Sequence, residues 1–176
     1  MFQHPTHPAT VHFPVTFSVL TGALDLLTFL SRQPATAKYT YQLFSLLALD
    51  DLAPQLLPQL SYHTTRALLL VSVPAVITGA IEVMPLIKRE GISSKKARTA
   101  ILHALLNDVT VVGALWNWWT RRDVEGYTPS DTNVFLSGVV ALPVTVYAAY
   151  LGGHLVYQYG MGVGRGNAPV KPKKNE

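Results

Sequence analysis

Three histidines and one glutamate lie inside or at the edges of long apolar stretches, where ionisable side chains are rare. They are His12, Glu82, His103 and His154. An ionisable group within a membrane span is energetically costly, so it marks either a functional site or a polar contact between helices. Imidazoles bind haem iron and other metal ions, and they also carry protons. The chain has no cysteine, which excludes thiolate ligands, disulfides and cysteine nucleophiles.

Four apolar stretches are long enough to be the helices that position these residues. Charged residues make up only 14% of the chain, against roughly 25% in an average soluble domain. We therefore predict an all-α fold, a four-transmembrane-helix bundle in a lipid bilayer over residues 1–160, followed by a flexible basic C-terminal tail over residues 161–176. The predicted spans, each close to the roughly 20 residues that cross a bilayer, run from about residue 11 to 31, 67 to 87, 99 to 120 and 133 to 159.

The connections between the spans differ in length and charge. The first is a long loop over residues 32–66, in which the apolar segment 39–52 is predicted to form a short interfacial helix stopped by Pro54 and Pro58. The second connection, residues 88–98, is short and strongly basic, whereas the third is mixed in charge.

The distribution of Lys and Arg predicts the orientation in the membrane. An even number of spans places both termini on the side that holds the basic 88–98 connection. That side collects Lys88, Arg89, Lys95, Lys96, Arg98, Arg165, Lys171, Lys173 and Lys174. The other side holds fewer basic residues, and acids are interleaved with them. These basic residues are Arg32, Lys38, Arg66, Arg121 and Arg122. The positive-inside rule then predicts that both termini are cytoplasmic. The basic pI follows from this pattern, so no nucleic-acid partner is expected.

Because successive spans alternate in direction, the four ionisable residues are predicted to share a layer near the cytoplasmic face. Glu82, His103 and His154 would each lie roughly 6–8 Å inside the membrane edge, with His12 somewhat nearer to it. Helical spacing also predicts three stripes that face the bundle interior. The stripes are His103, Asn107, Thr110, Ala114 and Asn117; Tyr147, Tyr150, His154 and Tyr157; and Ser72, Ala75, Gly79 and Glu82.

Paired imidazoles on facing helices are how helix bundles hold haem. We predict a b-type haem with His103 and His154 as axial ligands, in a redox-linked membrane protein. His12, which could replace either ligand, Glu82, Asn107 and Tyr157 complete the predicted cofactor site. A non-haem metal ion held by the three histidines and Glu82 is an alternative. Two further alternatives have no cofactor: a structural or interaction membrane protein whose polar layer only joins helices, and a small proton-coupled carrier that uses Glu82 and Asp25.

Several short motifs resemble an uncharacterised membrane family called domain of unknown function 2231. The opening HPxxVHFP-like motif is formed by His7, Pro8, Val11, His12, Phe13 and Pro14. Further matches are Asp25 in the first span, Gly79 and Glu82 in the second, His103 to Asn107 in the third, and Gly152, Gly153, His154, Leu155, Tyr157 and Gly160 in the fourth. The resemblance implies an electron-transfer setting with a redox partner, because some relatives are joined to Rieske-type iron–sulfur domains.

The last four residues resemble a sorting signal. Lys173 and Lys174 stand fourth and third from the C-terminus, as in the dilysine retrieval signal of endoplasmic-reticulum membrane proteins. The resemblance predicts an endoplasmic-reticulum location if the host is eukaryotic. Such a signal is read by a receptor and is not an anchor.

Overall fold

The computed structural model describes residues 6–49 and 56–161, and all regular elements in these two ranges are helical. The predicted tail, apart from Met161, and its dilysine motif lie outside the described residues. In chain order the elements are α1 (His7–Thr10), α2 (His12–Arg32), α3 (Ala37–Leu46), α4 (Leu56–Glu90), α5 (Lys95–Arg121), η1 (Glu125–Tyr127), α6 (Asp131–Val134), the π-helical η2 (Phe135–Ala141) and α7 (Leu142–Tyr157).

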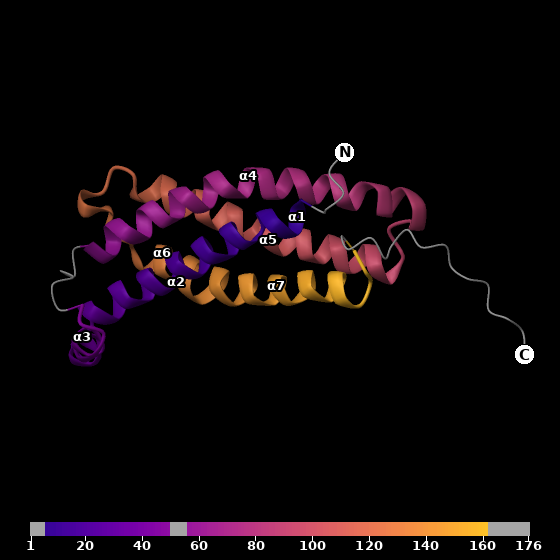
Figure 1. Cartoon of the computed structure of the whole chain (residues 1–176). Coiled ribbons are helices and arrows are strands. Elements are labelled where there is room, and N and C mark those ends of the chain that lie inside the picture. The colour runs from indigo at the N-terminus through magenta and orange to yellow at the C-terminus, as the bar shows by residue number, and fades with distance from the viewer. Residues whose placement is uncertain (1–5, 50–55, 162–176) are drawn as a thin grey trace, which may run out of the picture.

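The long helices run alternately up and down as a four-membered bundle (Figure 1). Helix α2 packs on α4, α4 on α5, and α5 on α7, while α7 and η2 return to α2. Helix α3 lies at one end of this bundle, and the turn between α4 and α5 lies at the other. These are referred to below as the α3 end and the turn end.

The four predicted spans are confirmed as helices long and apolar enough to cross a membrane: His7–Arg32, Leu56–Glu90, Lys95–Arg121 and Asp131–Tyr157. Their outer surface is apolar, with Leu70 74% and Val112 64% exposed. The interior, in contrast, contains many hydroxyl groups, among them those of Ser18, Thr65 and Thr145. A surface more apolar than the interior fits lipid rather than water as the surrounding solvent.

The second span begins earlier than predicted. Helix α4 starts at Leu56, so its first turns occupy residues that we assigned to the first loop. Pro58 does not stop a helix there; it lies in the first turn of α4, where a proline has no intrahelical hydrogen bond to lose. A helix does form within the shortened loop, as α3, but its position at a membrane interface remains a prediction.

Glycines allow close helix contacts at some of the places where they occur. A Cβ atom at Gly22 would lie 2.7 Å from the backbone oxygen of Ser137, and one at Gly138 would lie 2.5 Å from Leu26 Cγ. Helix α2 and η2 therefore approach each other at a distance that larger residues would not permit. Gly113 makes no such close contact, because a Cβ there would meet no atom within 4 Å in the described structure.

Candidate functional site

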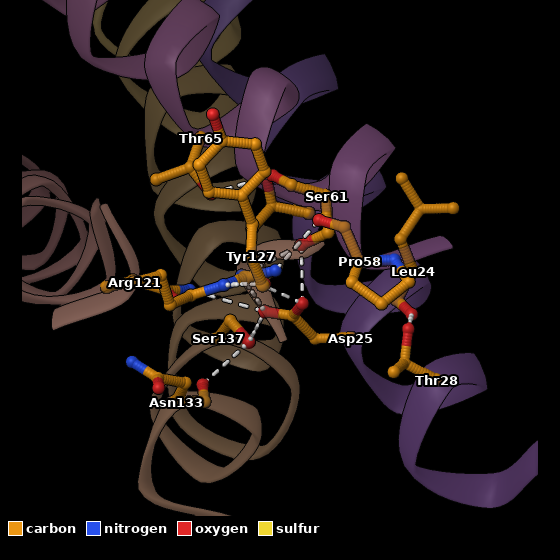
Figure 2. Close-up of polar contacts among 12 residues, drawn as sticks. Leu24, Asp25, Thr28, Pro58, Ser61, Thr65, Arg121, Tyr127, Asn133 and Ser137 are labelled. Carbon is orange, nitrogen blue, oxygen red and sulfur yellow. Dashed lines mark hydrogen bonds and ion pairs between the residues drawn. The ribbon is translucent and has the colours of Figure 1, made fainter. Parts of the chain in front are cut away.

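A fully buried ion pair lies near the α3 end of the bundle. Arg121 Nη1 donates to Asp25 Oδ1 at 3.1 Å and to Oδ2 at 3.3 Å, and both side chains are 0% exposed. Ser61 also donates to Oδ1, while Asn117 (3.2 Å) and Ser137 (2.6 Å) donate to Oδ2. Figure 2 shows Arg121 extending toward this carboxylate between the surrounding helices. We refer to these five residues as the Asp25–Arg121 network.

Arg121 also donates hydrogen bonds to two backbone carbonyls. Its Nε donates to Tyr127 O at 2.8 Å and its Nη2 to Pro58 O at 2.9 Å. The guanidinium thus connects the start of α4 and the η1 turn to the acid on α2 (Figure 2). Across the described residues, every buried side-chain nitrogen and oxygen has a hydrogen-bond partner. A network so fully bonded holds helices together and leaves little capacity to bind a ligand.

The partner of Asp25, Arg121, is not among the residues predicted from the sequence. We placed Arg121 among the loop charges of the far side, whereas it is the last residue of α5 and points inward. A signal was present: Arg121 follows Asn117 by one helical turn, so it continues the predicted stripe of α5. That stripe is confirmed as inward-facing, with Thr110, Ala114 and Asn117 buried and with His103 and Asn107 half-buried.

A second polar group lies toward the turn end and contains His7, which is not one of the predicted site residues. The His7 ring donates from Nδ1 to Ala75 O at 3.0 Å and lies 3.3 Å from Thr78 Oγ1. The His7 backbone N–H donates to Glu82 Oε1 at 3.1 Å. A carbonyl can only accept, so the proton of the neutral imidazole is assigned to Nδ1 and the lone pair to Nε2.

His103 is fixed in the same way from another helix. Its Nδ1 donates to Ala148 O at 2.8 Å, which again assigns the lone pair to Nε2. Asn107 donates to the His103 backbone oxygen at 2.7 Å, and its amide nitrogen lies 3.5 Å from His103 Nε2. The amide is therefore the nearest side-chain donor to that lone pair among the described residues.

The two imidazole rings lie close together, edge to face. Their ring centroids are 6.2 Å apart with an interplanar angle of 86°. Each ring also lies against a glycine: a Cβ at Gly79 would be 2.9 Å from His7 Cε1, and one at Gly152 would be 3.1 Å from His103 Cε1. We refer to His7, His103 and the adjacent Glu82 as the paired-histidine cluster.

The other predicted cofactor residues lie elsewhere. His154 is half-buried beside Tyr159, with ring centroids 5.3 Å apart. It is about 200° around α7 from Gly152, which contacts His103, so the structure does not bring His103 and His154 together. His12 is exposed. The inward tyrosine stripe is wrong, because Tyr147 is 50%, Tyr150 65% and Tyr157 86% exposed; α7 instead buries Thr145, Ala148, Leu151 and Leu155.

The sequence did contain a signal for His7. The buried face of α2 includes Ser18, Asp25 and Thr28. Continuing this face backward at helical spacing reaches His7, whereas His12 falls about 140° away from it. The VHFP-like motif contains His12, but helical spacing places His7, and not His12, on the buried face.

A small cavity of about 10 Å³ lies in the bundle interior next to the Asp25–Arg121 network. Its lining includes the side chains of Ser18, Thr110, Asn117 and Ser137. The surface that lines this cavity is nearly all apolar, so it does not suit a water molecule. The cavity offers no space for a larger ligand at this level.

Comparison with known proteins identifies a family but no activity. Residues 3–165 match the family described as "Predicted membrane protein (DUF2231)". Neither the curated proteins nor the solved structures include a match to the chain. The match agrees with the motifs noted in the sequence and with the four helices able to cross a membrane. The chain therefore belongs to the DUF2231 family of predicted integral membrane proteins.

Proposed function

We propose that the paired-histidine cluster binds a b-type haem, with His7 and His103 as the axial ligands, and that the chain is a redox-linked membrane protein. The observation that carries this proposal is the orientation of the two imidazoles. Each Nδ1 is bound to a backbone carbonyl, at 3.0 Å for His7 and 2.8 Å for His103. Metal-binding histidines usually have this second bond, since it fixes the tautomer and the direction of Nε2.

The separation of the rings supports two ligands on one metal. Two imidazoles that each bind a metal at about 2 Å have centroids about 6 Å apart. The observed centroid separation is 6.2 Å. Glycines at positions 79 and 152 allow both rings to lie close to the neighbouring helix backbones. An axial pair of His7 and His103 thus replaces the pair of His103 and His154 predicted from the sequence.

The number of available ligands favours haem over a bare metal ion. Within residues 6–49 and 56–161, no three or more His, Asp or Glu side chains are grouped so as to hold an ion. A bare ion would need such a group. Haem needs only two protein ligands, because the macrocycle provides the remaining coordination of the iron. Two neutral imidazoles would give a centre suited to electron transfer.

The competing hypotheses assign the polar residues other roles. A structural protein without cofactor would use the imidazoles only as helix contacts. The Asp25–Arg121 network, whose hydrogen bonding is complete, is such a contact. A proton-coupled carrier would require Asp25 to exchange protons with a pathway. The many donors bound to Asp25 disfavour that role.

The test is the visible spectrum of full-length protein purified from haem-replete cells, first oxidised and then reduced. We expect a Soret band with sharp reduced α and β bands, lost in His7→Gly and in His103→Gly. Added imidazole should restore the low-spin spectrum in either variant, which separates a lost ligand from a misfolded protein. His63→Gly and His154→Gly should keep the spectrum, since neither ring belongs to the pair.

Two results would overturn this proposal. The first is a colourless, folded wild-type protein from cells supplied with haem, which would leave the structural hypothesis. The second is a haem spectrum that survives His7→Gly but not His154→Gly, which would restore the pair predicted from the sequence. Metal analysis of the same samples would separate haem iron from a bound bare ion.

A further inference from the structure

An acidic side chain lies on the outer surface of the bundle at mid-depth. Asp108 is midway between Lys95 and Arg121, the two ends of α5, and is therefore about 20 Å from each. Its side chain is exposed. Among the described residues, no side chain or backbone group makes a hydrogen bond or ion pair with it. Neither the paired-histidine cluster nor the Asp25–Arg121 network includes it.

The surroundings of Asp108 are apolar. The residues on its face of α5 include Leu105 (56% exposed), Val112 (64%) and Trp119 (56%). Helix α5 packs on α4 and α7 with its other sides, so this face points away from the bundle. A carboxyl group in the middle of a lipid-facing surface would be costly, and such groups nearly always face protein or water instead.

We propose that this face of α5 is the interface between two copies of the chain lying side by side in the membrane. Copies inserted in the same direction are related by a two-fold axis along the membrane normal, so a residue meets groups at its own depth. Two Asp108 carboxyls would then meet near the axis and share a proton in a hydrogen bond. A carboxyl is self-complementary in this way, because its protonated form donates and its ionised form accepts.

The rest of the face suits a close contact. Ala104 is exposed one turn before Asp108, and its small side chain leaves room for a second helix to approach beside Asp108. Every Lys and Arg of α5 lies in its first or last turn, so the chain offers no cation on this helix at the depth of Asp108. The Asp108 of a second copy, which lies at the same depth, is therefore the polar partner that we infer for this carboxyl group.

Cysteine cross-linking in the full-length chain tests the contact directly. The chain has no native cysteine, so each variant carries a single thiol. In native membranes, Ala104→Cys and Val112→Cys should form disulfide-linked dimers under mild oxidation. Ile77→Cys is the matched control: Ile77 is exposed on α4, as far from the end of α4 as Asp108 is from the start of α5. It should remain unlinked.

Dimerisation in liposomes, measured by energy transfer between labelled copies at several protein-to-lipid ratios, tests the role of the carboxyl. Asp108→Leu should weaken dimerisation about threefold to tenfold, the range of effect that an interhelical hydrogen bond has in membranes. Asp108→Asn should retain most of the dimer, since an amide also donates and accepts. Neither substitution should unfold the monomer, because the Asp108 side chain makes no polar contact within the described chain.

The proposal is overturned if the wild-type chain stays monomeric at every ratio. It is also overturned if Ile77→Cys cross-links as well as Ala104→Cys, or if Asp108→Leu dimerises as tightly as wild type. A monomeric wild type would instead indicate a different membrane protein as the partner of Asp108. These results are independent of whether the chain binds haem.

Discussion

Replacing Arg121 and Asp25 separately and together should show a strong energetic coupling between them. Arg121→Met keeps the length of the side chain and removes its charge and its donors. Asp25→Asn removes the opposite charge. Because both side chains are 0% exposed and their atoms lie 3.1 Å apart, each single variant leaves the other group buried without its partner. Breaking a buried pair in this way costs about 3–5 kcal/mol.

The double variant should cost much less than the sum of the two single variants. It removes both charges, so neither remains uncompensated. Its residual cost comes mainly from Tyr127 O, which loses the Nε donor of Arg121, at about 1–3 kcal/mol for an unsatisfied carbonyl. Pro58 O also loses a donor but keeps its intrahelical bond in α4. We therefore expect a coupling energy of about 2 kcal/mol or more between positions 25 and 121.

The assay is the free energy of unfolding in mixed detergent micelles, followed by far-UV circular dichroism. A neighbouring ion pair serves as the matched control. Arg122 Nε lies 2.9 Å from Asp123 Oδ2, but these side chains are 38% and 84% exposed. The same cycle there, with Arg122→Met and Asp123→Asn, should give a coupling below about 1 kcal/mol. Equal coupling in the two cycles, or additive costs at positions 25 and 121, would refute the assignment of a buried structural pair.

Two further predictions concern packing and orientation. Gly22→Ala should lower the free energy of unfolding by about 1–3 kcal/mol, because its Cβ would lie 2.7 Å from the Ser137 backbone oxygen. Gly113→Ala, whose Cβ would meet no atom within 4 Å, should raise that free energy by about 0.5–1 kcal/mol. The two variants are compared by the same detergent titration, and a larger loss of stability at position 113 would contradict the packing described. For orientation, an impermeant thiol reagent applied outside intact cells should label Ser130→Cys and not Ser93→Cys, and the reverse pattern would show that the positive-inside prediction is inverted.

The four helices could be predicted because the sequence places its apolar residues in four long runs. The start of α4 could not be predicted in the same way. Residues 61–66 are mostly polar, and a hydropathy average treats them as loop. In the structure Ser61 and Thr65 face the bundle interior, where Ser61 binds Asp25. Polarity at the end of a membrane helix thus has two explanations, exposure to water or contact with another helix, and the sequence alone does not separate them.

The candidate sites were predicted only in part, for a related reason. Helical spacing shows which residues share a face, but not whether that face points inward. The polar face of α5 does point inward, while the tyrosines of α7 point outward. His7 and Arg121 were not selected because each lies at the end of a helix, where hydropathy assigns a polar residue to the adjoining loop. Helical spacing, which places each of them on a buried face, was the signal that the sequence offered.

The two polar groups differ in a way that assigns them different roles. The carboxylate of Asp25 accepts from four side chains, those of Ser61, Asn117, Arg121 and Ser137, which come from three other parts of the bundle. The bonds hold α2, α4, α5 and η2 together near the α3 end, and a ligand there would have to displace them. His7 Nε2, in contrast, has no hydrogen-bond partner within the described residues, while its Nδ1 is held at 3.0 Å by Ala75 O. Among the described residues, the Nε2 lone pair of this oriented ring is therefore available for a metal–ligand bond. Chemistry is therefore expected at the paired-histidine cluster, and the Asp25–Arg121 network is expected to keep the helices in place around it.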